Sequence, residues 1–224
     1  MTKGQESNST GRLVDDGLAS WEVATVVSSC LIAEWALVPF ASERGFLTAF
    51  PVLLAIGFMI FSHWYRGENL RTIGFRLDNF VAAARILILP TVGAVMLILI
   101  LGWALSGAAF VFRPWRLHLA LLPLWAIFQQ YALHGFINRR LQLAFGRGYK
   151  VTLLVGLVFG LLHLPNPILA FLTLLGGLIW ASVYQRQPNL WALGISHAIA
   201  SLALALAIPP NLINGLRVGF RYLN

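Results

Sequence analysis

Polar side chains interrupt several long apolar stretches of this sequence. Because a polar or ionisable group inside a membrane-spanning helix costs several kcal/mol, each such group is a candidate functional residue. An imidazole can transfer protons, an amide can position reacting groups, and a carboxylate can serve as a base. The candidates are Gln129, Gln130 and His134, then His163, then His197 and Ser201, and finally Glu34.

These groups are predicted to lie at similar depths in the membrane. At about 1.5 Å per residue, Gln129 lies roughly 17 Å from the inner end of its helix, His163 roughly 20 Å and His197 roughly 12 Å. Glu34 is also roughly 20 Å deep. Residues four apart share a helix face, which pairs Gln130 with His134, Phe159 with His163, and His197 with Ser201. Each group could instead only hydrogen-bond neighbouring helices, but the convergence favours one polar cavity, opening toward the inner leaflet.

The elements that carry these groups are predicted to be transmembrane helices. Of 224 residues, 58% are hydrophobic and only 11% are charged, against about 25% charged in soluble domains. The mean hydropathy is +0.77, and a span needs about 20 apolar residues. The sequence therefore predicts an all-α, polytopic transmembrane helix bundle with about seven spans, at 21–40, 46–65, 85–112, 115–140, 149–165, 168–184 and 190–208.

The chain is predicted to form a single transmembrane domain over residues 21–224. Residues 1–20 are polar and are predicted to be a disordered N-terminal tail, and the last fourteen residues are predicted to be a short amphipathic tail. Gly156 and Gly160 should let their helix pack closely against a neighbour. Pro90 is predicted to kink its helix, and the Pro165-Asn166-Pro167 run to break another.

The basic residues predict how the protein lies in the membrane. Eleven of the 16 Lys and Arg residues fall on the inner side if the N-terminus is cytosolic, which predicts that the C-terminus is outside. The net charge of +8 is spread between apolar stretches, so the predicted partners are membrane lipids rather than nucleic acid. Cys30 is the single cysteine, which excludes an intrachain disulfide.

Three short motifs resemble the CPBP family of membrane endopeptidases, which comprises CAAX proteases and bacteriocin-processing enzymes and is also called the Abi family. The family pattern is Glu-Glu-x-x-x-Arg, then Phe-x-x-x-His, then His-x-x-x-Asn. In this chain the three motifs are occupied by Gln129-Gln130-Tyr131-Ala132-Leu133-His134, by Phe159-Gly160-Leu161-Leu162-His163 and by His197-Ala198-Ile199-Ala200-Ser201. The resemblance covers about residues 121–206. It implies a fold that cleaves membrane-bound or prenylated peptides.

The chain departs from the family pattern where the chemistry matters most. Both Glu positions are Gln, the Arg position is His134, and the last Asn position is Ser201. In the family a Glu of the first motif is the expected general base, and a carboxamide cannot take that role. No Asp or Glu follows Asp78 in the sequence, so any carboxylate must come from the N-terminal part of the chain, where Glu34 is the candidate.

Three functions are compatible with these residues. The first is an active endopeptidase in which His134 or His163 is the base, Gln129 and Gln130 orient water, and His197 stabilises the oxyanion. The second is a catalytically silent pseudoprotease that binds a membrane peptide or a lipidated partner. The third is a transporter with a histidine relay, for which the Pro165-Asn166-Pro167 break resembles a discontinuous helix.

No cofactor is expected for any of these functions. The alternative is a zinc ion held by His134, His163 and His197, because neutral imidazole is a common zinc ligand. Their sequence spacing is unlike that of helical zinc motifs. The predicted partner in the cavity is a membrane-embedded or lipidated peptide or protein.

Overall fold

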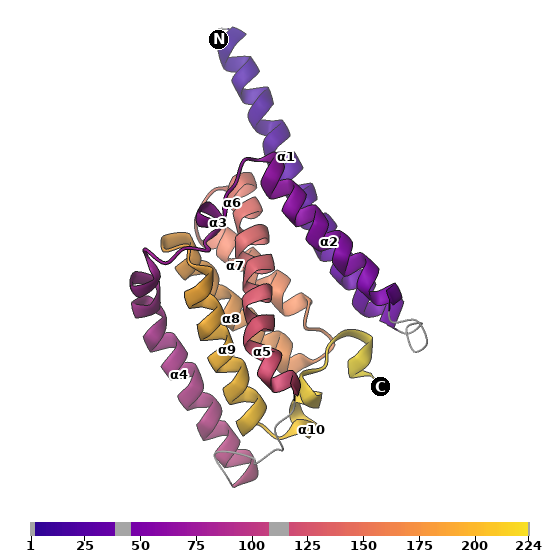
Figure 1. The fold of residues 1–224 in the computed structure, drawn as a ribbon, viewed down its shortest axis with the longest axis vertical. Coiled ribbons are helices and arrows are strands. Elements are labelled where there is room, and N and C mark those ends of the chain that lie inside the picture. The colour runs from indigo at the N-terminus through magenta and orange to yellow at the C-terminus, as the bar shows by residue number, and fades with distance from the viewer. Residues whose placement is uncertain (1–2, 39–45, 108–116, 224) are drawn as a thin grey trace.

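The computed structural model describes residues 3–38, 46–107 and 117–223. These ranges contain helices and no strand, which confirms the predicted all-α bundle (Figure 1). The helices are α1 (Lys3–Leu31), η1 (Ile32–Leu37), α2 (Phe46–Tyr65), α3 (Leu70–Ile73), α4 (Phe80–Ser106), α5 (Leu117–Gln130), η3 (Tyr131–Asn138), α6 (Arg139–Phe145), α7 (Tyr149–Leu161), α8 (Pro167–Arg186), α9 (Leu190–Ala207), α10 (Pro210–Ile213), η4 (Asn214–Leu216) and η5 (Gly219–Tyr222).

Long helical stretches occupy each of the predicted spans. Among the described residues, α4, α8 and α9 are long and apolar enough by themselves to cross a membrane. The apolar parts of α2 and α7 are shorter, and α5, η3 and α6 form one continuous stretch in which η3 is a π-helix. The exact number of spans therefore remains a prediction, and residues 39–40, 108–112 and 115–116 of the predicted spans lie outside the described ranges.

The N-terminal helix extends into the polar segment for which the sequence predicts a disordered tail, and that disorder stays a prediction. Helix α1 begins at Lys3 and runs without a break into η1, and its N-terminal part projects beyond the other helices (Figure 1). Extending an existing helix costs far less than starting one, so the buried part of α1, which includes Ala19 and Val23, provides a base from which the polar part can continue.

Small residues set the closest helix contacts, as predicted for Gly156 and Gly160. A Cβ added at Gly156 would lie 2.8 Å from the Leu178 side chain, and one at Gly160 would lie 3.0 Å from the carbonyl of Ala170. Both neighbours are on α8, so the glycines of α7 allow α7 and α8 to pack closely, which confirms the prediction. Helix α4 continues through Pro90 as one helix.

A buried group of charged side chains, which we call the Arg140 network, joins α1 and α2 to α6. Arg140 is fully buried and pairs with Glu22 of α1 at 3.0 Å and with Glu68, just after α2, at 2.8 Å. Ser62 donates to Glu22 at 2.5 Å, and His63 lies 2.6 Å from Glu68. The remaining members are Arg66, which pairs with Glu22, and Arg139, which pairs with Glu68.

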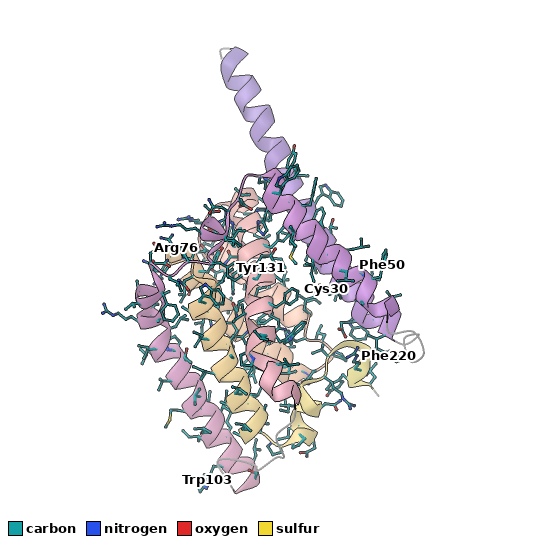
Figure 2. The ribbon with its side chains drawn as sticks, in the orientation of Figure 1. Cys30, Phe50, Arg76, Trp103, Tyr131 and Phe220 are labelled. Carbon is teal, nitrogen blue, oxygen red and sulfur yellow. The ribbon has the colours of Figure 1, made fainter. Side chains whose placement is uncertain are left out.

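The C-terminal segment, residues 210–223, folds back over the break between α7 and α8. The buried Asn166 side chain donates to the carbonyl of Ile213 at 2.9 Å and to that of Arg217 at 3.1 Å, while its oxygen caps α8 at Leu169. The Gly219 amide donates to the Leu164 carbonyl at 2.8 Å. Figure 2 shows Phe220 of this segment near the ends of α1 and α2 that lie away from Arg76. This segment was predicted only as an amphipathic tail, and it forms part of the bundle.

Candidate functional site

A cavity of about 1330 Å³ lies between α4, α5, α8, α9 and the C-terminal segment. Most of its lining is apolar. Four of the predicted site residues line it from three helical regions: Gln129, His163, His197 and Ser201. The predicted convergence of polar groups is therefore observed for these four residues. The cavity lies in the half of the bundle toward α10 rather than toward α6. The predicted orientation places the α6 end on the inner side of the membrane. An opening toward the inner leaflet and this orientation therefore cannot both hold, and each stays a prediction.

His163 presents one ring nitrogen to the cavity. Its Nδ1–H donates to the carbonyl of Phe159 at 2.7 Å, and the Phe159 ring meets the imidazole edge at 4.8 Å between centroids. These contacts fix the ring and assign the proton of the neutral imidazole to Nδ1. Within the described residues Nε2 has no hydrogen-bond partner, so its lone pair is available to a molecule in the cavity.

His197 is held on more sides than His163. The Gln130 amide donates to Nδ1 at 3.1 Å, and the backbone of Ala126 also hydrogen-bonds the ring. Trp180 lies 4.6 Å from the imidazole, and Phe159 lies 5.8 Å from it, both between ring centroids. With these bonds in place His197 is a positioned polar group, and Gln130, which is fully buried, supports it from behind rather than lining the cavity.

His134 does not line the cavity, in contrast to the prediction of one shared pocket. It is fully buried, stacks on Tyr184 at 5.6 Å between centroids, and its Nδ1 lies 3.2 Å from the Asn138 amide nitrogen. The reason is the π-helix η3, which begins at Tyr131. The wider turn of a π-helix changes the rotation per residue, so His134 points in a different direction from the one a regular α-helix would give it. Gln130 and His134 consequently meet different partners, His197 and Tyr184.

Glu34 lies away from the motif histidines. It lines a separate cavity of about 230 Å³ between η1 and α2, which Arg221 also borders. A Cβ at Gly219 would lie 3.1 Å from its carboxylate oxygen, so the C-terminal segment covers it. Equal depth in the membrane placed Glu34 near His163 in the sequence analysis, but depth does not fix the position of a helix around the bundle.

No carboxylate lines the large cavity among the described residues. Its polar lining includes three groups that the motifs did not indicate: Thr91, Trp180 and Ser196. Thr91 and Ser196 share a hydrogen bond of 2.7 Å, and the Trp180 indole donates to Ser196 at 3.0 Å. Trp180, which packs against His197, thereby links α8 to α9 and, through Ser196, to α4. A sequence does not indicate such Thr–Ser hydrogen bonds, because Thr and Ser are common in transmembrane helices for packing alone.

Two charged residues of the lining were also missed as site residues. Arg217 and Arg221 of the C-terminal segment border the cavity, whereas the distribution of basic residues predicted only that they lie on the outer side of the membrane. The described residues contain no group of three His, Cys, Asp or Glu side chains arranged to hold a metal ion. His134 is fully buried and does not line the cavity that His163 and His197 share.

Two carboxylates of the N-terminal part of the chain form ion pairs away from the cavity. Glu22 and Glu68 belong to the Arg140 network. Burial alone would raise the pKa of the Glu68 carboxyl, but hydrogen bonds from His63, Arg140 and Arg139 outweigh it and hold that pKa well below its ordinary value. The signal that could have found this network is the Arg139-Arg140 pair at the end of an apolar helix.

The comparisons with known proteins agree with the motifs. Residues 111–203 match the family model of type II CAAX prenyl endopeptidases of the Rce1-like kind. No curated protein and no solved structure matches the chain. With the three apolar helices long enough to cross a membrane, this match indicates an integral membrane protein. The resemblance predicted from the three motifs is thereby confirmed, and residues 111–203 are similar to the CAAX-protease family.

Proposed function

We propose that this protein is a membrane endopeptidase in which His163 is the general base. The observation that supports this is the orientation of His163: Nδ1 is occupied by the Phe159 carbonyl, and Nε2 faces the cavity without a partner in the described residues. An apolar surrounding disfavours the imidazolium, so the ring is in the form that can accept a proton. Of the two histidines considered as bases, His134 is fully buried and does not line this cavity, so it is set aside.

The proposed reaction uses His163 and Gln129 and needs no carboxylate. His163 Nε2 takes a proton from a water molecule, and the resulting hydroxide attacks the carbonyl carbon of the scissile peptide bond. The amide of Gln129 donates to the developing oxyanion. The imidazolium then returns its proton to the leaving nitrogen as the carbon–nitrogen bond breaks, which regenerates the neutral base.

The cavity fits a peptide that carries an apolar group. Small-molecule sites occupy about 300–1,000 Å³, and this cavity, at about 1330 Å³, is larger. Its lining is mainly apolar, with a polar group of Gln129, His163 and His197 at one part. The proposed substrate is therefore a membrane-embedded or lipidated peptide. Membrane lipids would contact the same helices.

The second candidate function is a pseudoprotease that binds the same peptide without cutting it. The observation that favours it is the absence of any carboxylate in the described lining of the cavity. Positioned acid–base catalysis contributes about 10² to 10⁴ in rate, and the family's expected base is replaced by a carboxamide. Binding would need only the apolar lining and the hydrogen-bonding groups, all of which are present.

The test compares new protein N-termini in membranes that contain wild-type protein, His163→Ala or His134→Asn. Peptides cut by the wild type and by His134→Asn, but not by His163→Ala, support the proposal. Cleavage that persists in His163→Ala refutes the role of His163. If the wild type cuts nothing, the Gln129→Glu variant separates the two candidates, because restored cleavage supports the pseudoprotease. Gln129 is chosen over Gln130 because only Gln129 lines the cavity.

A further inference from the structure

A chain of side-chain hydrogen bonds leads from the surface just after α6 to the buried His134 in η3 (Figure 1). The exposed Arg147 guanidinium donates to the Gln142 side-chain oxygen at 3.1 Å. The Gln142 amide donates to the Asn138 side-chain oxygen at 3.0 Å. The Asn138 amide nitrogen lies 3.2 Å from His134 Nδ1, and both residues are fully buried. We call these four residues the Arg147 chain, and the proposed reaction uses none of them.

Arg147 gives the chain a single direction, because a guanidinium only donates hydrogen bonds. The Gln142 atom that meets Arg147 must be its oxygen, which leaves its NH₂ group to face Asn138. The Asn138 oxygen accepts from that group, so its own NH₂ group faces His134. Burial in apolar surroundings keeps the His134 imidazole neutral, and Nδ1 must then be the acceptor. The direction of the chain therefore places the proton of His134 on Nε2.

Two buried side-chain atoms next to this chain have no hydrogen-bond partner within the described residues. They are Nε2 of His134 and Oε1 of Gln130. The direction of the chain makes the first a donor, and the second is an amide oxygen, which accepts. Both lie beside His197: the Gln130 amide donates to its Nδ1 at 3.1 Å, and His134 interacts with it electrostatically. A donor and an acceptor placed in this way are the groups that a buried water molecule bridges.

We propose that His134 Nε2 and Gln130 Oε1 bind one water molecule, which keeps the Gln130 amide directed at His197. Nδ1 of His197 is then an acceptor, and its proton is on Nε2, the nitrogen left for the backbone of Ala126. The members of the Arg147 chain are positioning residues, because none of them lines the cavity. The inference rests on the proposed function only in treating His197 as part of the site. Loss of His134 should slow cleavage by about tenfold or less and should not abolish it.

The experiment reverses the chain with one substitution. In Gln142→Glu a carboxylate accepts from Arg147 as the amide oxygen did, but it cannot donate to Asn138. The Asn138 amide should then turn its NH₂ group toward the carboxylate and its oxygen toward His134. The proton of His134 should consequently move from Nε2 to Nδ1. A role in stability alone would not move this proton.

The measurement is solid-state NMR of the full-length protein in phosphatidylcholine bilayers, with isotopically labelled histidine. The ring-nitrogen signals report which nitrogen carries the proton. The protein has 5 histidines, and variants that each lack one of them assign the signals.

Gln185→Glu is the matched control for the added charge. Gln185 is also partly buried near the α6 end, where its oxygen accepts from the Gly148 amide at 2.8 Å and its amide donates to Thr152 at 3.1 Å. This variant makes the same chemical change outside the Arg147 chain. The His134 proton should therefore stay on Nε2.

A second pair of variants tests the link to His197. His134→Phe keeps a ring that can pack on Tyr184 but removes the donor. The Gln130 amide is then free to turn, and His197 should change from one tautomer to a mixture of two. His134→Gln places an NH₂ group near the position of Nε2 and should restore the single tautomer. Thermal unfolding establishes that each variant is folded before its spectrum is interpreted.

The inference is overturned by any of four results: a wild-type His134 protonated on Nδ1, a proton that stays on Nε2 in Gln142→Glu, the same shift in Gln185→Glu, or a single His197 tautomer in folded His134→Phe. The spectra require no cleavage. The expected tautomers in a protein that cuts nothing would leave this inference standing and remove only the catalytic part of the proposed function. Cleavage by a protein that lacks these tautomers would remove this inference alone.

Discussion

The Arg140 network and the cavity share one continuous helical stretch, since Arg140 lies on α6 and Gln129 on α5. In the network, buried carboxylates are paired with buried arginines. In the cavity, the motif side chains are neutral amides, imidazoles and a hydroxyl, and the charged lining is two arginines without an ion pair in the described residues. Breaking a buried ion pair leaves the remaining charge without its partner, which is costly, whereas replacing a neutral side chain of the cavity leaves no buried charge behind.

The difference also explains where the carboxylates of this chain are used. Glu22 and Glu68 come from α1 and from the connection after α2, and both reach α6. The family pattern places carboxylates on the helix that holds Gln129, but here Glu22 and Glu68 hold two N-terminal helices against that stretch. If this comparison is right, variants in the network should change stability, and variants in the cavity should change binding or turnover.

The largest expected effect is at Arg140. Arg140→Ala leaves Glu22 and Glu68 buried without their partner, which should lower the free energy of unfolding by about 3–5 kcal/mol. Thermal or denaturant unfolding in detergent measures the loss, with the exposed Arg147→Ala as the matched control. If the two variants lost the same stability, the network would not be the joint between α1, α2 and α6.

The next effect is the acid sensitivity that Glu68 gives the fold. Its pKa is depressed in the folded protein, so its stabilisation is complete above the unfolded value of about 4.3 and is lost as the pH falls through the folded pKa. At neutral pH, Glu68→Gln should cost about 1.5–3 kcal/mol.

The measurement is a set of unfolding curves for wild type and Glu68→Gln from neutral pH downward. The gap between the two proteins should narrow once the pH passes below about 4. A gap independent of pH would mean that the carboxylate charge contributes nothing to the network.

A smaller effect separates the two glutamines. Gln130→Ala removes the amide that donates to His197 and leaves Nδ1 of the imidazole without that partner, at a cost of about 1–3 kcal/mol. Gln129→Ala should change stability by less than about 0.5 kcal/mol, because Gln129 lines the cavity. Unfolding of both variants under one condition makes the comparison. A reversed order would exchange the roles assigned to them.

The smallest effect is expected at Ser201. It lines the cavity, and no hydrogen bond fixes its side chain within the described residues. Ser201→Ala should therefore stay within about 0.5 kcal/mol of wild-type stability in the same unfolding measurement. A larger loss of stability would mean that the Ser201 hydroxyl makes a contact on which the fold depends.

The sequence by itself determined the kind of fold and most of the motif positions. Hydropathy and length alone fix which segments are apolar helices, because every backbone polar group in lipid must be bonded within the helix. The spacing of Phe159 and His163 correctly predicted that the two residues are in contact, since they lie on the regular helix α7 and the turn that follows it. The pairing of His197 with Ser201 on one face held for the same reason.

Only the tertiary structure decided which polar groups face the cavity. The π-helix at Tyr131 turned His134 toward Tyr184, and a sequence does not signal such a change of helical period. Depth along a helix placed Glu34 beside His163, but rotation about the bundle separated them. The positions of Arg217 and Arg221 depended on the fold of the C-terminal segment onto Asn166. These outcomes arise from contacts between residues far apart in the chain, which helical periodicity does not encode.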